Sequence, residues 1–85
     1  MDEVDAKLRG IIIKNAQKNV TENDINEDSI LDHDFGIDSV VMIMVIIDLE
    51  NTFAITIKDE DINLSTLKEY RYLKQFVNAK LSTAE

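Results

Sequence analysis

Residues 34–47 read Asp-Phe-Gly-Ile-Asp-Ser-Val-Val-Met-Ile-Met-Val-Ile-Ile, a glycine-containing loop that leads into an unbroken apolar run. This stretch decides the fold, because Val and Ile favour strands while the flanks of the run favour a helix. Asp38 and Ser39 are residue types that cap helix N-termini, and the pattern continues through Asn51, which is long for a strand. We therefore predict a helix from Val40 to about Asn51.

An amphipathic helix is predicted on the N-terminal side of this stretch, from Asp2 to about Val20. Acidic residues in its first turn suit the positive end of the helix dipole. Gly10, inside the pattern, costs about 1 kcal/mol relative to alanine. The apolar stripe of this helix consists of Val4, Leu8, Ile11, Ile12, Ala16 and Val20.

The segment between this helix and the apolar run, residues 21–37, is polar and rich in turn-forming residues. A loop of this length is uncommon in a compact domain and is often functional. Four apolar residues interrupt the segment and predict an ordered loop that is pinned across the core: Ile25, Ile30, Leu31 and Phe35.

The C-terminal half is predicted to hold a connector, a short helical turn and a last helix. Residues 53–57 alternate apolar and polar, but with no second strand to pair with they indicate an extended connector. Residues 58–62 suit one short helical turn. Thr66 is expected to cap the last helix, with Glu69 completing a capping box, and residues 82–85 are expected to fray. The apolar stripe of the last helix is Leu67, Tyr70, Leu73, Phe76 or Val77, and Leu81.

These segments predict an all-α fold, a four-helix bundle with three main helices, one short helix and a long first loop. The 85 residues fit a single domain of residues 1–85, and 45% of them are hydrophobic, which is enough for a compact core. We expect a monomer.

The composition excludes several classes of function. Acidic residues outnumber basic ones 17 to 9, which argues against a nucleic acid or an anionic membrane as partner and favours a basic protein surface. No cysteine is present, so any thiol chemistry needs a prosthetic group. Residues 1–5 are acidic, unlike a signal peptide, and the apolar run is too short for a membrane span, so we expect a cytoplasmic protein.

Ser39 could serve as a helix cap, as a catalytic residue or as a site of covalent attachment. A serine at a helix start is most often a cap. A catalytic serine needs a base, and the one histidine, His33, lies six residues upstream with nothing to orient it, so we expect no catalytic residue. We expect no metal site either, because a calcium loop starting at Asp32 would put Gly36 at the fifth ligand position. A helix N-terminus does, however, suit an attached phosphate.

The order of these features resembles the acyl carrier protein family over nearly the whole chain. It runs from the acidic loop through Phe35-Gly36-Ile37-Asp38-Ser39-Val40 and the apolar helix to Leu49-Glu50-Asn51-Thr52-Phe53. Ile55-Thr56-Ile57, an acidic turn and a capped last helix follow. The resemblance implies an acyl-carrier-protein-like bundle that is not itself an enzyme.

On this resemblance Ser39 matches the serine that accepts 4'-phosphopantetheine from coenzyme A, through a phosphodiester made by a separate transferase. The thiol of that arm carries an acyl or aminoacyl group as a thioester. Asp38 matches the acidic residue that helps engage the transferase, Gly36 lets the backbone turn into the helix, and Phe35 and Ile37 anchor the loop. The implied partners are the phosphopantetheinyl transferase, an acyl-loading ligase or synthase, and downstream enzymes of fatty-acid, polyketide or nonribosomal-peptide type biosynthesis.

The sequence departs from the family pattern on the apolar helix. Val41 and Met44 stand where the resemblance places acidic residues, and Val40 replaces the usual leucine. Val41 and Met44 should lie outside the core at helical spacing. The inward-facing turns are expected to be covered by other residues of the run: Val40, Ile43, Ile46, Ile47 and Leu49. Val41 and Met44 are then either two scattered apolar side chains or part of a hydrophobic docking strip beside Ser39.

A docking strip would favour peptidyl, aryl or polyketide loading at least as much as general fatty-acid synthesis. The docking candidates are Val40, Val41, Met44, Ile47, Asp48 and Glu60. Carboxylates that could still contact basic partners are Asp38, Asp48, Glu50, Asp59, Glu60 and Asp61. The alternative function is an unmodified helical interaction module that associates through the apolar face at Val41 and Met44.

Overall fold

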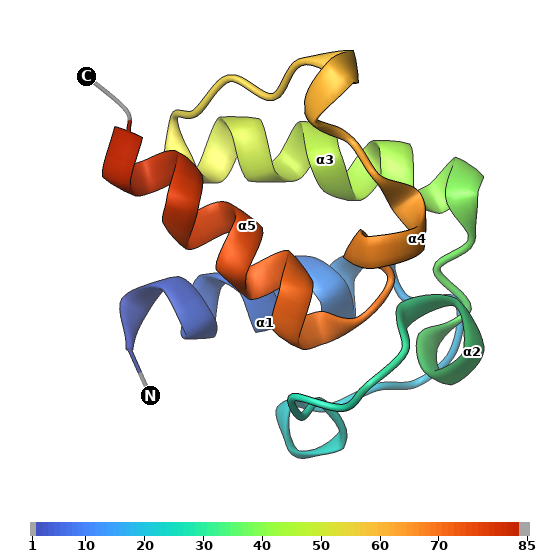
Figure 1. Ribbon diagram of the computed structural model, residues 1–85. Helices are drawn as coiled ribbons and strands as arrows, with labels where there is room; N and C mark the ends of the chain where they lie inside the picture. The colour runs from blue at the N-terminus through green and yellow to red at the C-terminus, as the bar shows by residue number, and fades with distance from the viewer. Residues whose placement is uncertain (1, 84–85) are drawn as a thin grey trace.

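The computed structural model describes residues 2–83, which form three long helices: α1 (Glu3–Asn15), α3 (Ser39–Phe53) and α5 (Tyr70–Thr83) (Figure 1). The connections hold two short α-helices and two 3-10 turns: α2 (Leu31–Phe35), α4 (Leu64–Leu67), η1 (Glu22–Asp24) and η2 (Asp59–Asp61). No β-strand forms within the described residues. The predicted all-α bundle with three main helices is confirmed, and its connections hold two short α-helices rather than one.

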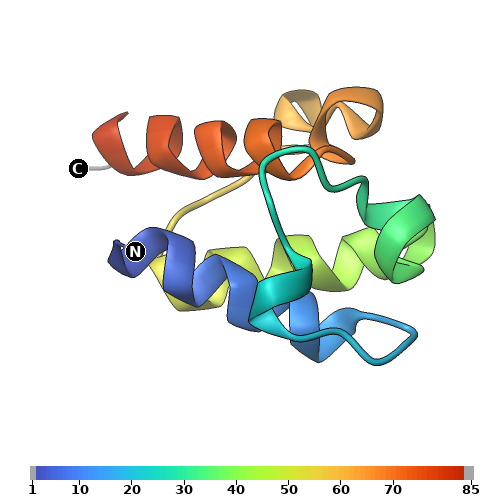
Figure 2. The ribbon, with the colours of Figure 1, turned by 90° about the horizontal axis from the view of Figure 1, so that it is seen from below.

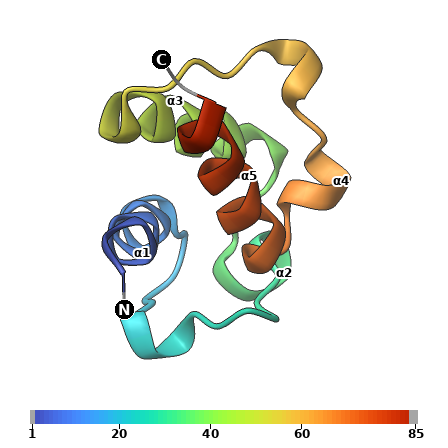
Figure 3. The same cartoon turned by 60° about the vertical axis from the view of Figure 1, so that its left-hand side comes forward.

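The three long helices pack around one core. Figure 2 shows α1 and α3 side by side in one layer, with α5 and α4 in a second layer, and Figure 3 shows α1 nearly end-on beside α3 and α5. The fully buried residues of each long helix include a pair at i, i+4 spacing, which lies on one stripe of a helix. These residues are Leu8 and Ile12, Val45 and Leu49, and Leu73 and Val77. None of the helices within residues 2–83 has both the length and the apolar composition of a membrane span.

The apolar run folds as a helix, as its flanks predict. α3 begins one residue earlier and ends two residues later than expected. Its buried residues are Met42, Val45, Ile46 and Leu49, spaced i, i+3, i+4 and i+7, so one face of the run enters the core. The helix ends at Ala54, whose φ of 54° lies in the left-handed region.

α1 is shorter than the predicted helix, which extended to about Val20. Ala16 has extended backbone angles, φ −62° and ψ 144°, and the Gln17 N–H donates to the Phe35 carbonyl at 2.9 Å. Because this hydrogen bond ties the chain to the end of α2, the chain leaves the helix after Asn15. Ala16 and Val20 still pack against the core, but from outside the helix.

The long first loop is ordered, as predicted, and backbone pairing fixes it to the junction between α4 and α5. Residues 29–31 run antiparallel to residues 68–70. The contacts are the hydrogen bond from the Leu31 N–H to the Lys68 carbonyl (2.6 Å), the hydrogen bond from the Tyr70 N–H to the Ser29 carbonyl (2.9 Å), and the Ile30–Glu69 bridge. Side chains add to this pairing, because Ile25, Leu31 and Phe35 are buried.

The last helix begins later than predicted, and the predicted Thr66–Glu69 capping box is wrong. Asn63 caps α4 instead, since its side-chain oxygen accepts the Thr66 N–H at 3.3 Å. The chain then leaves the helix at Lys68 and Glu69, and α5 starts at Tyr70. The pairing with the first loop explains this break, because the Lys68 carbonyl accepts the Leu31 N–H from that loop.

The other C-terminal predictions are close to the structure. The extended connector is present with Ile55 and Ile57 buried, although Phe53 belongs to α3. The predicted short turn is η2. α5 continues through Ser82 and Thr83, where fraying was expected, and residues 84–85 lie outside the described residues.

A buried carboxylate joins α1, α5 and the first loop. Asp5 is only 7% exposed, and its oxygens accept hydrogen bonds from the Tyr70 hydroxyl at 2.5 Å and from Arg9 Nε at 2.8 Å. The Lys74 ammonium lies 3.5 Å from the same carboxylate, and Arg9 also donates to backbone carbonyls of the loop. The sequence assigned Asp5 only to the helix dipole, because its partners are up to 65 residues away.

Burial disfavours the charged form of Asp5, but the hydrogen bonds from Tyr70 and Arg9 and the charges of Arg9 and Lys74 outweigh it and lower the pKa. Burial and the Asp5 hydrogen bond raise the pKa of the Tyr70 hydroxyl. Since the folded pKa of Asp5 is depressed, its contribution to stability is complete above the unfolded value of about 3.9. That contribution is lost as pH falls through the folded pKa.

We expect Asp5→Asn to lower the free energy of unfolding by about 2 kcal/mol at pH 7, because it weakens hydrogen bonds to a charged, buried group. The loss should shrink as the pH falls below about 4. Urea unfolding at several pH values measures both effects. Glu3→Gln is the matched control, because the Glu3 side chain is 82% exposed, and a loss as large as that of Asp5→Asn would contradict the assignment.

Candidate functional site

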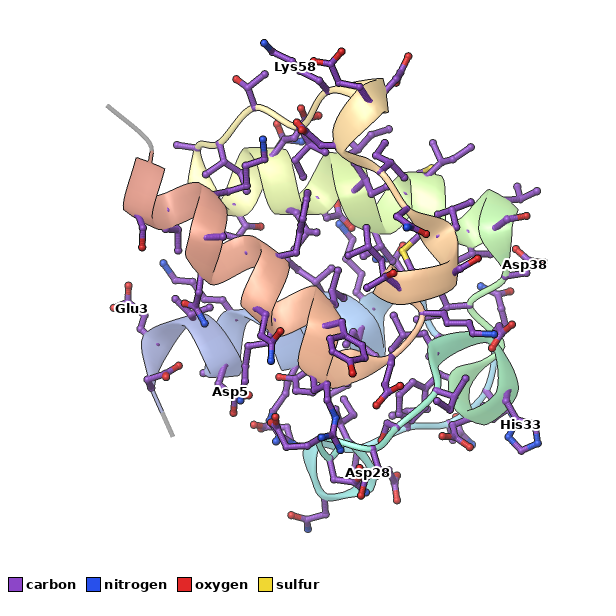
Figure 4. All side chains as sticks on the ribbon, viewed as in Figure 1. Glu3, Asp5, Asp28, His33, Asp38 and Lys58 are labelled. Carbon is purple, nitrogen blue, oxygen red and sulfur yellow. The ribbon has the colours of Figure 1, made fainter. Side chains whose placement is uncertain are left out.

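Ser39 is the first residue of α3, and its side chain is exposed. The alternative that Ser39 caps the helix is excluded, because the cap is Asp38, whose carboxylate accepts the Val41 N–H at 2.9 Å. Among residues 2–83 no group hydrogen-bonds to the Ser39 hydroxyl. Figure 4 shows Asp38 at the N-terminal end of α3, above His33, which lies on the short helix α2. The helix start is thus stabilised without the serine hydroxyl, which is left for other chemistry.

Gly36 makes the turn from α2 into α3. It ends α2 with a φ of +71°, in the left-handed region that favours glycine. A Cβ at this position would lie 2.9 Å from the Cβ of Gln17, so space as well as backbone conformation requires glycine. Phe35 and Ile37, on either side, are 2% and 1% exposed and anchor the turn as predicted.

A small cavity of about 90 Å³ opens beside Ser39, between the start of α3 and α4. Ile37, Met42 and Leu64 provide its apolar wall. Its polar lining includes Asp38 and Lys68 as well as the serine. The sequence did not indicate this cavity, because it did not predict α4, the short helix that carries Leu64 and ends at the cap residue Lys68.

The exposed face of α3 differs in part from the prediction. The expectation that Val40, Ile43 and Ile47 face the core is wrong, because their exposed fractions are 71%, 57% and 45%. Met44 is exposed as expected, at 54%, but Val41 is partly buried and packs against the core. The reason is the phase of the helix, since Met42, Val45, Ile46 and Leu49 occupy the core-facing positions. The exposed strip therefore consists of Val40, Ile43, Met44 and Ile47.

The two acidic docking candidates have different surroundings. Asp48 is bound to α1, because its carboxylate accepts a hydrogen bond from Asn15 at 2.9 Å and lies 3.2 Å from the Lys14 ammonium. The hydrogen bond from Asn15 lowers the pKa of Asp48, and the contact with Lys14 lowers it further. Together they outweigh burial, which raises the pKa. Glu60 is exposed on η2. Asp48 thus serves the packing of α3 on α1.

His33 lies on α2 and contacts its neighbour rather than the serine. Its Nδ1 is 3.0 Å from a carboxylate oxygen of Asp34, whose other oxygen accepts the Ile30 N–H at 2.7 Å. The Ile30 hydrogen bond and the His33 contact lower the pKa of Asp34. Residues 2–83 contain no group of three or more metal-ligand side chains in a metal-binding arrangement.

The geometry is that of an exposed serine on a fixed turn at the start of a long helix. A protein-family model described as the phosphopantetheine attachment site matches residues 6–70, from α1 to the first residue of α5. The chain belongs to this family. Neither the curated proteins nor the solved structures compared with it give a match.

Members of the phosphopantetheine attachment-site family carry 4'-phosphopantetheine covalently on a serine. They are non-catalytic carriers, which agrees with the expectation that the chain is not an enzyme. A carrier of this family interacts with a phosphopantetheinyl transferase and with biosynthetic enzymes in general. The acyl-carrier resemblance is thereby confirmed.

We expect Gly36→Ala to lower the free energy of unfolding by about 2 kcal/mol, because a Cβ strains the left-handed backbone and meets Gln17. Gly10→Ala is the matched control, since nothing lies within 4 Å of its added Cβ. In the interior of α1 that change should stabilise the protein by about 1 kcal/mol. Urea unfolding of both variants measures the difference, and equal effects would refute the role assigned to Gly36.

Proposed function

We propose that Ser39 is the serine that carries the 4'-phosphopantetheine arm. The observation that supports this is its free, exposed hydroxyl at the first residue of α3, with the capping carried out by Asp38. The residues fit the group, because the N-terminal end of a long helix favours an attached phosphate.

The other two serines in the matched segment are poorer candidates. Ser29 is 4% exposed, and its hydroxyl oxygen accepts the Asn26 N–H at 3.0 Å. Ser65 is exposed but lies inside α4, a helix of four residues, so it has no long helix behind it. Within residues 6–70, Ser39 alone combines exposure, a free hydroxyl and a long helix.

Attachment transfers a phosphopantetheinyl group from coenzyme A. Ser39 Oγ attacks the phosphorus that bears the pantetheine, and its proton passes to a base of the transferase. An Oγ–P bond forms, the phosphoanhydride P–O bond of coenzyme A breaks, and adenosine 3',5'-bisphosphate leaves. The arm supplies the thiol that this cysteine-free chain lacks. We propose that Asp38 presents its carboxylate to the transferase while it caps α3.

We further propose that the carrier receives its acyl or aminoacyl cargo from a loading enzyme that contacts the exposed strip of α3. The strip, Val40, Ile43, Met44 and Ile47, follows Ser39 on one face and contains no carboxylate. An apolar surface of this kind suits a loading enzyme with an apolar contact surface and resists screening by salt. This favours peptidyl, aryl or polyketide loading at least as much as fatty-acid synthesis.

Incubation with coenzyme A, Mg²⁺ and a promiscuous phosphopantetheinyl transferase should add one phosphopantetheinyl group to wild type, as read by intact mass. Ser39→Ala should gain nothing, because it has no Oγ to form the phosphodiester. Ser65→Ala should be modified like wild type, since it removes an exposed serine of the same segment. If several transferases fail to modify wild type, the proposed attachment is wrong. The alternative function would then remain, an unmodified interaction module that uses the apolar strip.

We expect Met44→Glu and Ile43→Glu to leave folding intact and to lower kcat/KM for loading by the natural partner about tenfold, as loss of an apolar contact of 1–2 kcal/mol would. Thr52→Glu, exposed near the end of the same helix, is the control for added charge. Val41→Glu is a poor probe, because Val41 packs against the core. Loading rates equal to that of Thr52→Glu would exclude the strip as a docking surface.

A further inference from the structure

Lys68 stands at the C-terminal end of α4 and lines the same 90 Å³ cavity as Ser39. Its backbone is held in place, because its carbonyl accepts the Leu31 N–H at 2.6 Å and its N–H donates to the Leu64 carbonyl at 3.2 Å. The pairing that breaks the last helix therefore also places this lysine beside the serine.

The Lys68 side chain is without a charged partner in the part of the chain that the structure describes. Within residues 2–83, six of the nine basic residues are in ion pairs: Lys7, Arg9, Lys14, Arg71, Lys74 and Lys80. The three basic residues that form no ion pair among the described residues are Lys18, Lys58 and Lys68, and of these only Lys68 lines the cavity beside Ser39. Its ammonium is therefore available to an anion at Ser39.

Modification of Ser39 would bring a further negative charge to the cavity. Its other charged lining residues are Asp32 and Asp38, both carboxylates. A phosphodiester on Ser39 adds a third negative charge to this small space, and like charges at close range repel each other. Lys68 is the one lining residue that can offset this repulsion.

The geometry points to Lys68 as a positioning residue for the arm. Its ammonium pairs with a phosphodiester oxygen on Ser39 and directs the first part of the arm over the cavity wall, toward Leu64 and Met42. The exposed strip of α3 is thereby kept clear for a partner. This inference rests on the proposed attachment at Ser39 and adds the residue that orients the product of that attachment.

The test compares ³¹P NMR spectra of modified wild type, Lys68→Met and Lys68→Arg at low ionic strength. We expect the phosphodiester resonance of Lys68→Met to be displaced from that of wild type, and Lys68→Arg, which keeps the charge, to restore the wild-type position. Added salt should move the wild-type resonance toward that of Lys68→Met, because salt screens an exposed pair. Lys58→Met is the control, since Lys58 lies far from Asp38 in Figure 4.

Amide NMR gives a second readout. Attachment should shift the amide signals of residues 64–68 in wild type, but not in Lys68→Met. The exposed Lys68 side chain should be replaceable without loss of the fold, and the dispersion of the same spectra checks this.

Coincident ³¹P resonances in wild type and Lys68→Met, or a displacement that Lys68→Arg does not restore, would overturn the role of Lys68 and leave the attachment standing. Wild type that gains no phosphopantetheinyl mass would overturn the attachment at Ser39, and this inference with it. Intact mass distinguishes the two failures before any spectrum is recorded.

Discussion

The structure depends on the backbone pairing between residues 29–31 and residues 68–70. This short antiparallel contact connects the long first loop to the junction of α4 and α5. It orders the loop and sets where α2 begins, so Gly36 turns the chain into α3 at a fixed place. On the other side it ends α4 and puts Lys68 at the cavity. Both walls of the site beside Ser39 are thus set by contacts between segments far apart in the sequence.

Much of the fold could be predicted from local sequence. The caps and length around the apolar run were enough to identify α3 as a helix against its strand-forming composition. Gly36, Asp38 and Ser39 form a loop, a cap and a helix start that follow one another directly, and the family resemblance gave them their roles in the site. The family match agrees with the resemblance that these residues carried.

The parts that sequence missed have physical reasons. A run of eight apolar residues lacks the alternation of polar and apolar positions that marks the buried face of a helix, so Val40, Ile43 and Ile47 were assigned to the core. Packing of α3 against α1 and into the shared core sets the phase. The break before α5 was invisible because Thr66 and Glu69 fit a capping box locally, whereas the competing bonds come from the first loop. The partners of Asp5 are likewise distant in sequence.

Asp38 caps α3 and Ser39 does not, and this affects how enzymes can distinguish the bare carrier from the modified one. Because the aspartate alone secures the helix start, modification of the serine hydroxyl removes no bond on which the fold relies. On the proposal that Ser39 bears the arm, the bare and the modified protein share one scaffold. An enzyme that must tell them apart then has to recognise the arm and its cargo, because the fold behind Ser39 is the same in both forms.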